Sequence, residues 1–384
     1  MRDKRFNENQ LRAISGGEGP LLIAAGPGSG KTTVLTHRIK YIIEELGARP
    51  GSILVMTFSR AAAEEMKERF LGMKIRDADK VCFGTFHSVF FGILRTAYGS
   101  MAPGYIFGED AKDQIRFDEM LKLAEELLKE REDICKSIRS RYRWILIDEF
   151  QDIDDLQYEI VRLIAPPDTH PNITVVGDDD QSIYAFRGAN PRIMMNFEND
   201  YQGTEKVILD VNYRSGREIV SAASKLIAHN NNRIRKTIVS AKGNVSDVKI
   251  LEFEDTRSEY EYLVRDIEQS VRSGGRENDI AVLHRNNMQP WQLTCLLKER
   301  KLENVHVMTF HKSKGLEFSE VWIIDACEGV TPDRKAVTAE DIEEERRLFY
   351  VAMTRARDRL RICRGRIHRS RTTKRSRFTE EVCG

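Results

Sequence analysis

The chain has 384 residues, which at about 150 residues per domain predicts two or three domains. Its 41% hydrophobic content suffices for folded cores and excludes a wholly disordered chain, and no apolar run approaches the ~18 residues of a membrane span. The opening MRDKRFNENQ lacks a signal-peptide core, and the six cysteines show no CxxC spacing, so we expect a cytoplasmic protein without a zinc site or disulfide framework. The 61 basic and 60 acidic residues give a net charge of +1, which by itself indicates no nucleic-acid partner.

Short apolar runs alternate with amphipathic segments in the first half of the chain. Strands are predicted at 21–26, 52–58, 80–86, 144–150 and 173–178, with helices at 32–46 and 59–72 between them. This alternation predicts parallel βαβ units with helices on both faces of a sheet. Residues 89–143 contain no convincing strand, and we interpret them as a small helical insertion; a plain connecting helix pair is equally acceptable.

The second half repeats this alternation. Strands are predicted at 207–213, 248–253, 279–285, 305–311, 320–325 and 359–363, and EYEYLVRDIEQSVRSG and EEERRLFYVAMTRAR read as helices. The join between the two predicted domains is placed near Tyr201–Thr204, where the dipeptide Gln-Gly follows a predicted helix. We therefore predict two α/β domains in tandem, 1–203 and 204–384.

The segment AGPGSGKTT at 25–33 follows a predicted strand and opens a predicted helix. Its glycines let the backbone curl so that N–H groups face phosphate oxygens, and the helix N-terminus adds positive potential. Lys31 is predicted to reach the β- and γ-phosphates and Thr32 to hold Mg²⁺. A glycine-rich turn alone is often only a turn, but GKT in this context favours a nucleotide site. The other predicted contacts of this loop are Gly28, Gly30 and Thr33.

Two adjacent acids end the apolar run WILIDEFQD at 144–152. They fall at the C-terminal end of a buried strand, where ligands bind in α/β proteins. Asp148 suits the Mg²⁺ shell, and Glu149 suits polarising an attacking water. Adjacent acids often mark only the solvated end of a strand. The predicted phosphate-binding loop (P-loop) at 25–33 makes that interpretation less favoured.

Together these motifs resemble those of the UvrD/Rep/PcrA-type helicases of superfamily one. The resemblance covers nearly the whole chain in the family's order. It is carried by FNENQ (6–10), VMTFSRAAAEEM, GTFHS, GDDDQSIYAFRGA (177–189), VNYRS (211–215), MTFHKSKGLEF (308–318) and ERRLFYVAMTRARDRL (345–360). It implies an α/β fold of two tandem RecA-like P-loop domains with parallel sheets.

The resemblance also implies roles around the nucleotide. Gln10 would hydrogen-bond the adenine, Tyr213 and Arg38 would sandwich its ring, and Glu317 would contact the ribose region. Gln181 would sense the γ-phosphate. Arg214 and Arg355 would stabilise charge developing on that phosphate, a role worth ~10³–10⁵ in rate. Taken singly, each arginine could instead be a surface salt bridge.

DNA contacts are implied for the loops of the first domain and for the motif at 177–189. Phe58, Tyr184 and Phe186 would stack on bases, which is worth ~1–3 kcal/mol per base and tolerates any sequence. Thr85, His87, Arg187 and His311 would contact phosphates or couple the sites. Aromatics near a motif are often core residues, and histidines in folded domains are often structural.

The implied activity is that of an ATP-dependent 3′→5′ DNA helicase or translocase. It would move on single-stranded DNA and at single/double-strand junctions by hydrolysing ATP, with Mg²⁺, in the cleft between the two domains. The family carries two large accessory insertions; here the first is at most 89–143, and the second is essentially absent. Weak unwinding is therefore expected. The alternatives are a DNA-stimulated motor subunit regulating a partner nuclease or repair complex, and an inactive DNA-binding scaffold.

Basic residues are concentrated near the C-terminus. Between 355 and 377 there are eleven, against one acid, Asp358. The stretch from about 364 to 384 is interpreted as a tail that forms a nucleic-acid arm, with a partner-docking peptide or a solvated tail as alternatives.

Overall fold

The computed structural model describes residues 6–98, 117–243, 246–286, 290–368 and 371–383. These residues divide into two compact units. The first comprises Met1–Ala25, Gly30–Asp179 and Tyr184–Leu209, and the second comprises Gly26–Ser29, Asp180–Ile183 and Asp210–Gly384, each apart from the residues outside the described ranges.

The first unit is built on a six-stranded sheet in the order β3-β2-β4-β5-β1-β6, and every neighbouring pair is parallel. The strands are β1 (Leu21–Ala25), β2 (Ile53–Thr57), β3 (Cys82–Thr85), β4 (Trp144–Ile147), β5 (Asn172–Gly177) and β6 (Glu205–Leu209). β1, β2 and β4 are buried throughout, as expected for strands covered on both faces. The parallel sheet predicted for the first half is confirmed.

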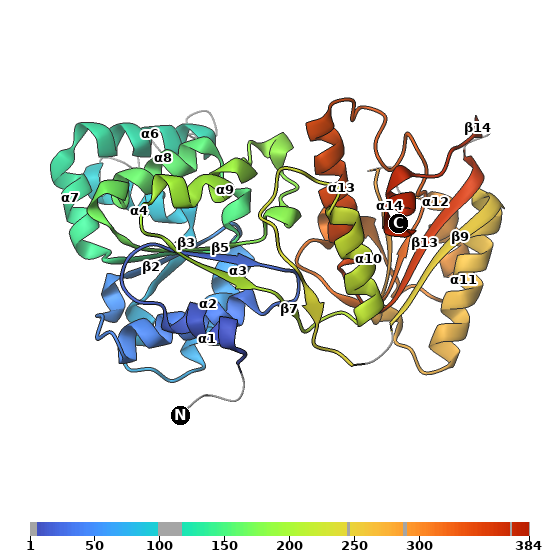
Figure 1. Cartoon of the computed structure of the whole chain (residues 1–384), viewed down its shortest axis with the longest axis horizontal. Helices are drawn as coiled ribbons and strands as arrows, with labels where there is room; N and C mark the ends of the chain where they lie inside the picture. The colour runs from blue at the N-terminus through green and yellow to red at the C-terminus, as the bar shows by residue number, and fades with distance from the viewer. Residues whose placement is uncertain (1–5, 99–116, 244–245, 287–289, 369–370, 384) are drawn as a thin grey trace, which may run out of the picture. The chain divides into compact units, whose positions relative to one another are not determined.

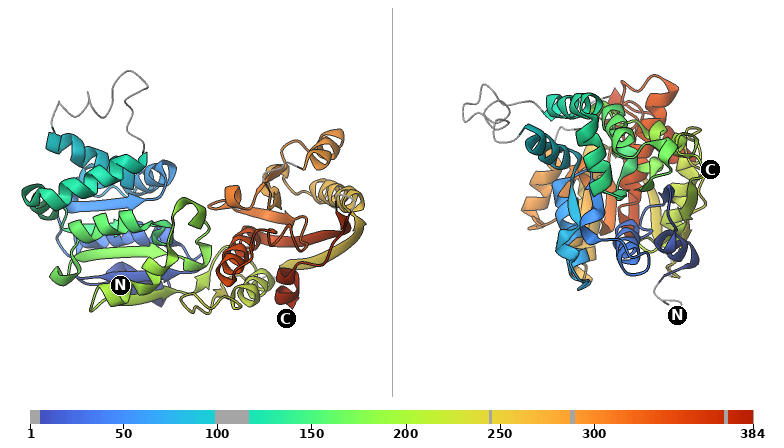
Figure 2. Two further views of the ribbon diagram at one scale, coloured as in Figure 1. Left: turned by 90° about the horizontal axis from the view of Figure 1, so that it is seen from above. Right: turned by 90° about the vertical axis from the view of Figure 1, so that its left-hand side faces the viewer.

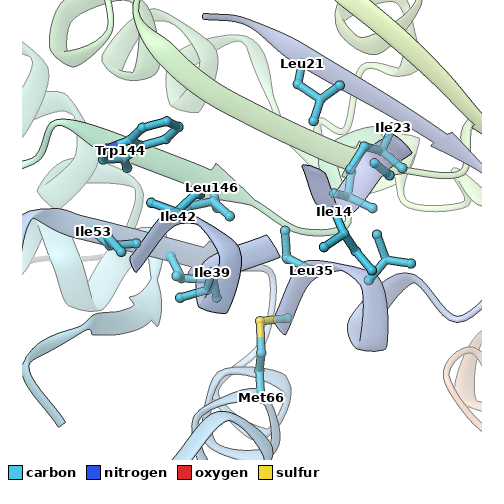
Figure 3. Close-up of a cluster of buried hydrophobic side chains, with 14 of the residues drawn as sticks. Ile14, Leu21, Ile23, Leu35, Ile39, Ile42, Ile53, Met66, Trp144 and Leu146 are labelled. Carbon is cyan, nitrogen blue, oxygen red and sulfur yellow. The ribbon is translucent and has the colours of Figure 1, made fainter. Parts of the chain in front are cut away.

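Helices cover both faces of this sheet (Figure 1). One face carries α1 (Glu8–Ser15), α2 (Lys31–Glu44) and α3 (Arg60–Leu71); the other carries α4 (Phe86–Tyr98), α6 (Phe117–Glu130), α7 (Glu132–Arg141), α8 (Asp155–Ile164) and α9 (Pro191–Asp200). Figure 3 shows the core beneath α2, where Leu35, Ile39 and Ile42 pack toward Ile53 and Leu146.

The described part of the predicted insertion at 89–143 consists of helices with short connections. In α6 the buried residues recur at helical spacing, from Met120 and Leu121 through Ala124 to Leu127 and Leu128, so one face of this helix packs inward. Residues 99–116 lie outside the described ranges.

The second unit has its own mostly parallel sheet. In the order β11-β10-β12-β13-β9, all neighbours are parallel, and β14 adds an antiparallel ladder to β13. The strands are β9 (Asp247–Asp255), β10 (Ile280–His284), β11 (His306–Thr309), β12 (Phe318–Ile323), β13 (Ala356–His368) and β14 (Arg371–Thr372). A separate parallel pair is formed by β7 (Val211–Asn212) and β8 (Val239–Ser240).

Helices also flank the second sheet on both sides (Figure 2, left). One side carries α11 (Thr256–Arg272) and α12 (Trp291–Glu299); the other carries α10 (Arg217–Ile227), α13 (Ala339–Met353) and α14 (Arg377–Cys383). Both halves therefore have the α/β fold predicted for them. Among the described residues, no helix combines the length and apolar character needed to cross a bilayer.

The join between the units differs from the predicted one. β6 lies beyond the predicted boundary at 203/204, yet it pairs with β1 and completes the first sheet. The strand predicted at 207–213 is interrupted at Asp210: the residues before it belong to β6, and Val211–Asn212 pairs with β8 as β7. The β-branched pattern on both sides of Asp210 predicts one strand, although the chain changes sheet at that residue.

The basic tail is folded, which corrects the interpretation of 364–384 as a free arm. β13 runs on to His368, and α14 packs against α10, with Phe378 fully buried. Several of its arginines are paired within the unit: Arg364 donates to Glu252 at 3.2 Å and Arg377 to Glu328 at 2.8 Å. Part of the positive charge read from the sequence is therefore matched by acids distant in the chain.

We predict that Phe378→Ala lowers the free energy of unfolding by about 3–5 kcal/mol, because it leaves a cavity where the ring packs on Phe349. Urea denaturation measures this change. Val337→Ala, at a side chain that is 83% exposed, serves as the control and should change stability by less than about 0.5 kcal/mol. Equal, small effects of both substitutions would contradict the docking of α14.

Candidate functional site

The P-loop connects β1 to α2. Gly28 and Gly30 have φ angles of +64° and +82°, a left-handed conformation that side chains disfavour. At Gly28 a Cβ would lie 2.6 Å from Cβ of Arg214, so this glycine also permits a close approach. Gly30 is the N-cap of α2 and supplies no side-chain cap. The first turn of α2 therefore offers backbone N–H groups suited to an anion.

Lys31 faces the acids that follow β4 and β5. Its Nζ lies 3.5 Å from Oε2 of Glu149. Burial alone lowers the pKa of Lys31, but four carboxylates outweigh that effect and the pKa is raised. These carboxylates belong to Glu149, Asp178, Asp148 and Asp152. The lysine thus stays protonated, as a phosphate-binding residue requires.

Asp148 fits the role of a cation ligand. It is 5% exposed, and its Oδ1 accepts no hydrogen bond from the described residues. Burial, with Glu149 as the second cause, raises the pKa of Asp148 to about 7. A buried carboxylate oxygen without a partner and the hydroxyl of Thr32, in the first turn of α2, are the oxygen ligands that Mg²⁺ prefers.

Gln151 joins the loops after β4 and β5, and the sequence analysis assigned it no role. It is fully buried. Its Oε1 accepts from the backbone N–H of Asp178 at 2.9 Å, and its Nε2 donates to Glu149 and, at 3.2 Å, to Asp152. Glu149 itself has a φ of +51°. The amide of Gln151 therefore fixes the orientation of the Glu149 carboxylate.

The second unit brings several of the predicted residues together. Arg355 is 2% exposed, and its Nη2 donates to Oε1 of Gln181 at 3.0 Å. Nε of Arg214 donates to Oε2 of Glu317 at 2.7 Å, and Arg214 and Arg357 lower the pKa of Glu317 against the opposing effect of burial. Tyr213 is 43% exposed, and its N–H donates to the carbonyl of Gly28.

Arg38 does not occupy the predicted position. It is fully buried, and it donates to the hydroxyl of Thr174 at 2.9 Å and to the carbonyl of Gly16 at 2.8 Å. Burial lowers the pKa of Arg38 to about 10. The stacking of Arg38 on adenine is therefore wrong: the guanidinium has no exposed face and instead stabilises the turn after α1. Arg38 lies in the predicted helix 32–46, and the sequence pattern of that helix did not reveal this burial.

Gln10 lies beside the P-loop. Its side chain and that of Asn7 form a capping box at the start of α1. The N–H of Gln10 donates to Oδ1 of Asn7 at 2.7 Å, and the N–H of Asn7 donates to Oε1 of Gln10 at 3.0 Å. A Cβ at Gly30 would lie 3.3 Å from Nε2 of Gln10. The adenine contact expected of Gln10 stays a prediction.

An aromatic cluster lies on the first unit. Phe58 and Tyr184 stack with ring centroids 5.3 Å apart and planes 9° from parallel. Phe186 meets Tyr184 edge-on and is 65% exposed. The guanidinium of Arg187 lies over both Tyr184 and Phe186. Exposed rings beside an arginine form a surface suited to stacking with bases.

The remaining predicted contacts are less decisive. Thr85 caps the start of α4 through Ser88, whose N–H donates to its Oγ1 at 3.2 Å. His87 and His311 are half-buried, and Thr33 accepts from Arg69 at 3.4 Å. These placements leave their predicted roles as proposals.

Comparison with known families accounts for both halves. The model for the UvrD/REP helicase N-terminal domain matches residues 6–110 and 101–202, and that for the UvrD-like helicase C-terminal domain matches 207–304 and 295–365. The chain belongs to the UvrD-like helicase family. Its two α/β units are consistent with the tandem RecA-like domains expected of a UvrD-like protein.

Curated UvrD-like relatives are about twice as long as this chain. A putative ATP-dependent DNA helicase YjcD of Bacillus subtilis is 34% identical, with the match covering 73% of this chain and 46% of the relative. ATP-dependent DNA helicases PcrA of Staphylococcus epidermidis and Staphylococcus aureus are each 30% identical, with 74% of this chain and 48% of the relative covered. The chain thus spans about half the length of these relatives.

We predict that Asp148→Asn raises the free energy of unfolding of the metal-free protein at pH 8. The pKa of Asp148, about 7 in the folded state, exceeds the ordinary value near 4, so the folded state binds more protons than the unfolded state between about pH 4 and pH 7. Stability from this group therefore falls as pH rises through that window, and the substitution removes the loss. Urea denaturation in chelator at pH 4.5 and pH 8 measures it. A gain of the same size at both pH values would contradict the assignment; Asp168→Asn, at an exposed acid, is the control.

Proposed function

We propose that this chain is an ATP-dependent DNA helicase or translocase that moves 3′→5′ on single-stranded DNA. The observation that carries the proposal is the pairing of the P-loop Lys31 with Glu149 beside the buried Asp148. Membership of a family whose relatives are named ATP-dependent DNA helicases supports it. The aromatic cluster of Phe58, Tyr184 and Phe186 supports a sequence-tolerant grip on single strands.

In this proposal, different residues of the first unit bind the phosphates, hold Mg²⁺ and activate the attacking water. Lys31 and the first turn of α2 bind the β- and γ-phosphates, and Thr32 and Asp148 would hold Mg²⁺, which neutralises phosphate charge when bound. Glu149, oriented by Gln151, accepts a proton from the water that attacks the γ-phosphorus. The bond from that phosphorus to the bridging oxygen breaks, which yields ADP and phosphate.

The second unit supplies further polar groups. In this proposal Gln181, whose side chain accepts from Arg355, would respond to the γ-phosphate, and Arg214 and Arg355 would stabilise the charge that develops in the transition state. Tyr213 would contribute the stacking on adenine. The alternative of a motor subunit that regulates a partner nuclease gains no support from the family match or from the described residues, and we do not propose it.

We expect ATP hydrolysis that is stimulated by single-stranded DNA and is reduced about a hundredfold or more by Glu149→Gln, because the amide cannot accept the proton from water. A phosphate-release assay with and without single-stranded DNA measures both effects. Glu18→Gln, at an exposed acid, should hydrolyse ATP at the unaltered rate. Hydrolysis that persists in Glu149→Gln would exclude this carboxylate as the base.

Polarity is tested with tailed duplexes. The chain should separate a duplex with a 3′ single-stranded tail better than one with a 5′ tail, and a blunt duplex least. A strand-displacement assay with ATP, repeated with Lys31→Ala as a control without phosphate binding, measures the three rates. Robust unwinding from the 5′ tail alone would refute the proposed direction.

A further inference from the structure

Residues Asp180–Ile183 are enclosed within the second unit, although they directly follow the loop after β5. All four side chains are nearly or fully buried, from 5% exposed at Gln181 to 0% at Ile183. Five cationic side chains of the second unit reach this segment. They are Arg233, Lys236, Lys314, Arg347 and Arg355.

Asp180 is the only one of the four residues whose own side chain carries a charge. Arg233 grips its carboxylate with two hydrogen bonds, Nε to Oδ1 at 2.7 Å and Nη2 to Oδ2 at 2.6 Å. Nζ of Lys236, whose side chain is fully buried, lies 3.2 Å from Oδ2. A bidentate arginine fork fixes orientation as well as distance. The backbone at Asp180 is therefore held in one place.

The loop that carries Arg233 is itself anchored on α13. Oε1 of Glu343 accepts from the N–H of Asn231 at 2.7 Å, and its Oε2 accepts from Nδ2 of Asn232 at 3.0 Å. On the same helix, Arg346 donates to Asn230 and to Glu381 of α14. The loop that carries Arg233 is thus held to helix α13 by these hydrogen bonds, and so is the arginine that pairs with Asp180.

The other contacts hold the two residues that follow Asp180 and also come from the second unit. Arg355 follows the end of α13 and holds the amide of Gln181, Lys314 donates to the Gln181 carbonyl at 2.9 Å, and Arg347 donates to the Ser182 carbonyl at 3.1 Å. The fork on Asp180 adds to these contacts, because it anchors the chain one residue before Gln181 through two further hydrogen bonds.

We infer that Asp180 is a positioning residue for ATP hydrolysis: its pairing with Arg233 and Lys236 fixes residues 180–183 on the second unit and so holds Gln181 against Arg355. This inference rests on the proposed function, because it assigns Asp180 an effect exerted through Gln181. Asp180 does not touch the reacting atoms in this scheme. Its loss is expected to affect turnover more than ATP affinity.

The first test is a double-mutant cycle with Gln181→Ala. Asp180→Asn should lower the DNA-stimulated kcat about tenfold to a hundredfold with little change in the KM for ATP. In the Gln181→Ala protein, Asp180→Asn should lower kcat no further, because it acts through the removed side chain. Losses that multiply in the double variant, or an unchanged kcat in Asp180→Asn, would overturn the inference.

A control separates positioning from general destabilisation. Arg361→Gln removes the pairing of another buried arginine of the second unit with a carboxylate, that of the partly exposed Asp247. This pair is not among the contacts described above for residues 180–183. Melting curves set a temperature at which every variant is folded. Where Asp180→Asn does not fold, Arg233→Lys keeps the positive charge but loses the fork, and it should give the same kcat effect in weaker form.

A second readout does not depend on hydrolysis. Hydrogen–deuterium exchange of peptides covering 180–183 should rise in Asp180→Asn and stay unchanged in Arg361→Gln, because only the first substitution releases the segment. Unchanged exchange in Asp180→Asn overturns the inference whether or not the chain hydrolyses ATP. If the two variants show this exchange pattern but the unaltered chain shows no DNA-stimulated hydrolysis, the proposed function is overturned instead.

Discussion

The charge of Lys31 can be buried only because four carboxylates surround it, and the parallel sheet brings them there. β1, β4 and β5 run in the same direction, so their carboxyl ends share one edge and the loops after them meet. An antiparallel neighbour would carry its acids to the opposite edge. The same requirement explains Gln151, which ties the two acidic loops together with both ends of its amide. The burial of Lys31 in the fold and its proposed role in phosphate binding therefore depend on the same group of acids after β4 and β5.

The second unit meets the same requirement with α13 at its centre. Glu343, Arg346 and Arg347 on this helix are buried, and each is paired with a loop, a backbone carbonyl or α14. A buried ion pair contributes little net stability compared with apolar packing, but the loss of one partner is costly. Such pairs define a single arrangement more than they strengthen the fold. Helix α13 thus fixes where Arg355 and the segment after β5 lie.

The strands were largely predictable because parallel, doubly covered strands read as continuous apolar runs. The P-loop and the acids after β4 were predictable because their chemistry lies in short contiguous motifs. The errors have a different origin. The role predicted for Arg38 rests on the family resemblance, and that predicted for the basic residues after 363 rests on their charge. Their partners, such as Thr174 for Arg38 and Glu252 for Arg364, are distant in the sequence. The grip of Arg233 on Asp180 joins residues 53 positions apart, and no local pattern announces it.

The place of β13 in its sheet affects how the chain is made. β13 lies between β12 and β9, yet it is synthesised after both of them and about a hundred residues after β9 begins. During translation, the first unit acquires all its strands by Leu209, while the nascent second unit would present two strand edges that lack their central partner. Unpaired edges invite pairing with other chains. β13 is thus the strand that closes the sheet, and a chain that stops before β13 is complete leaves the facing edges of β12 and β9 unpaired.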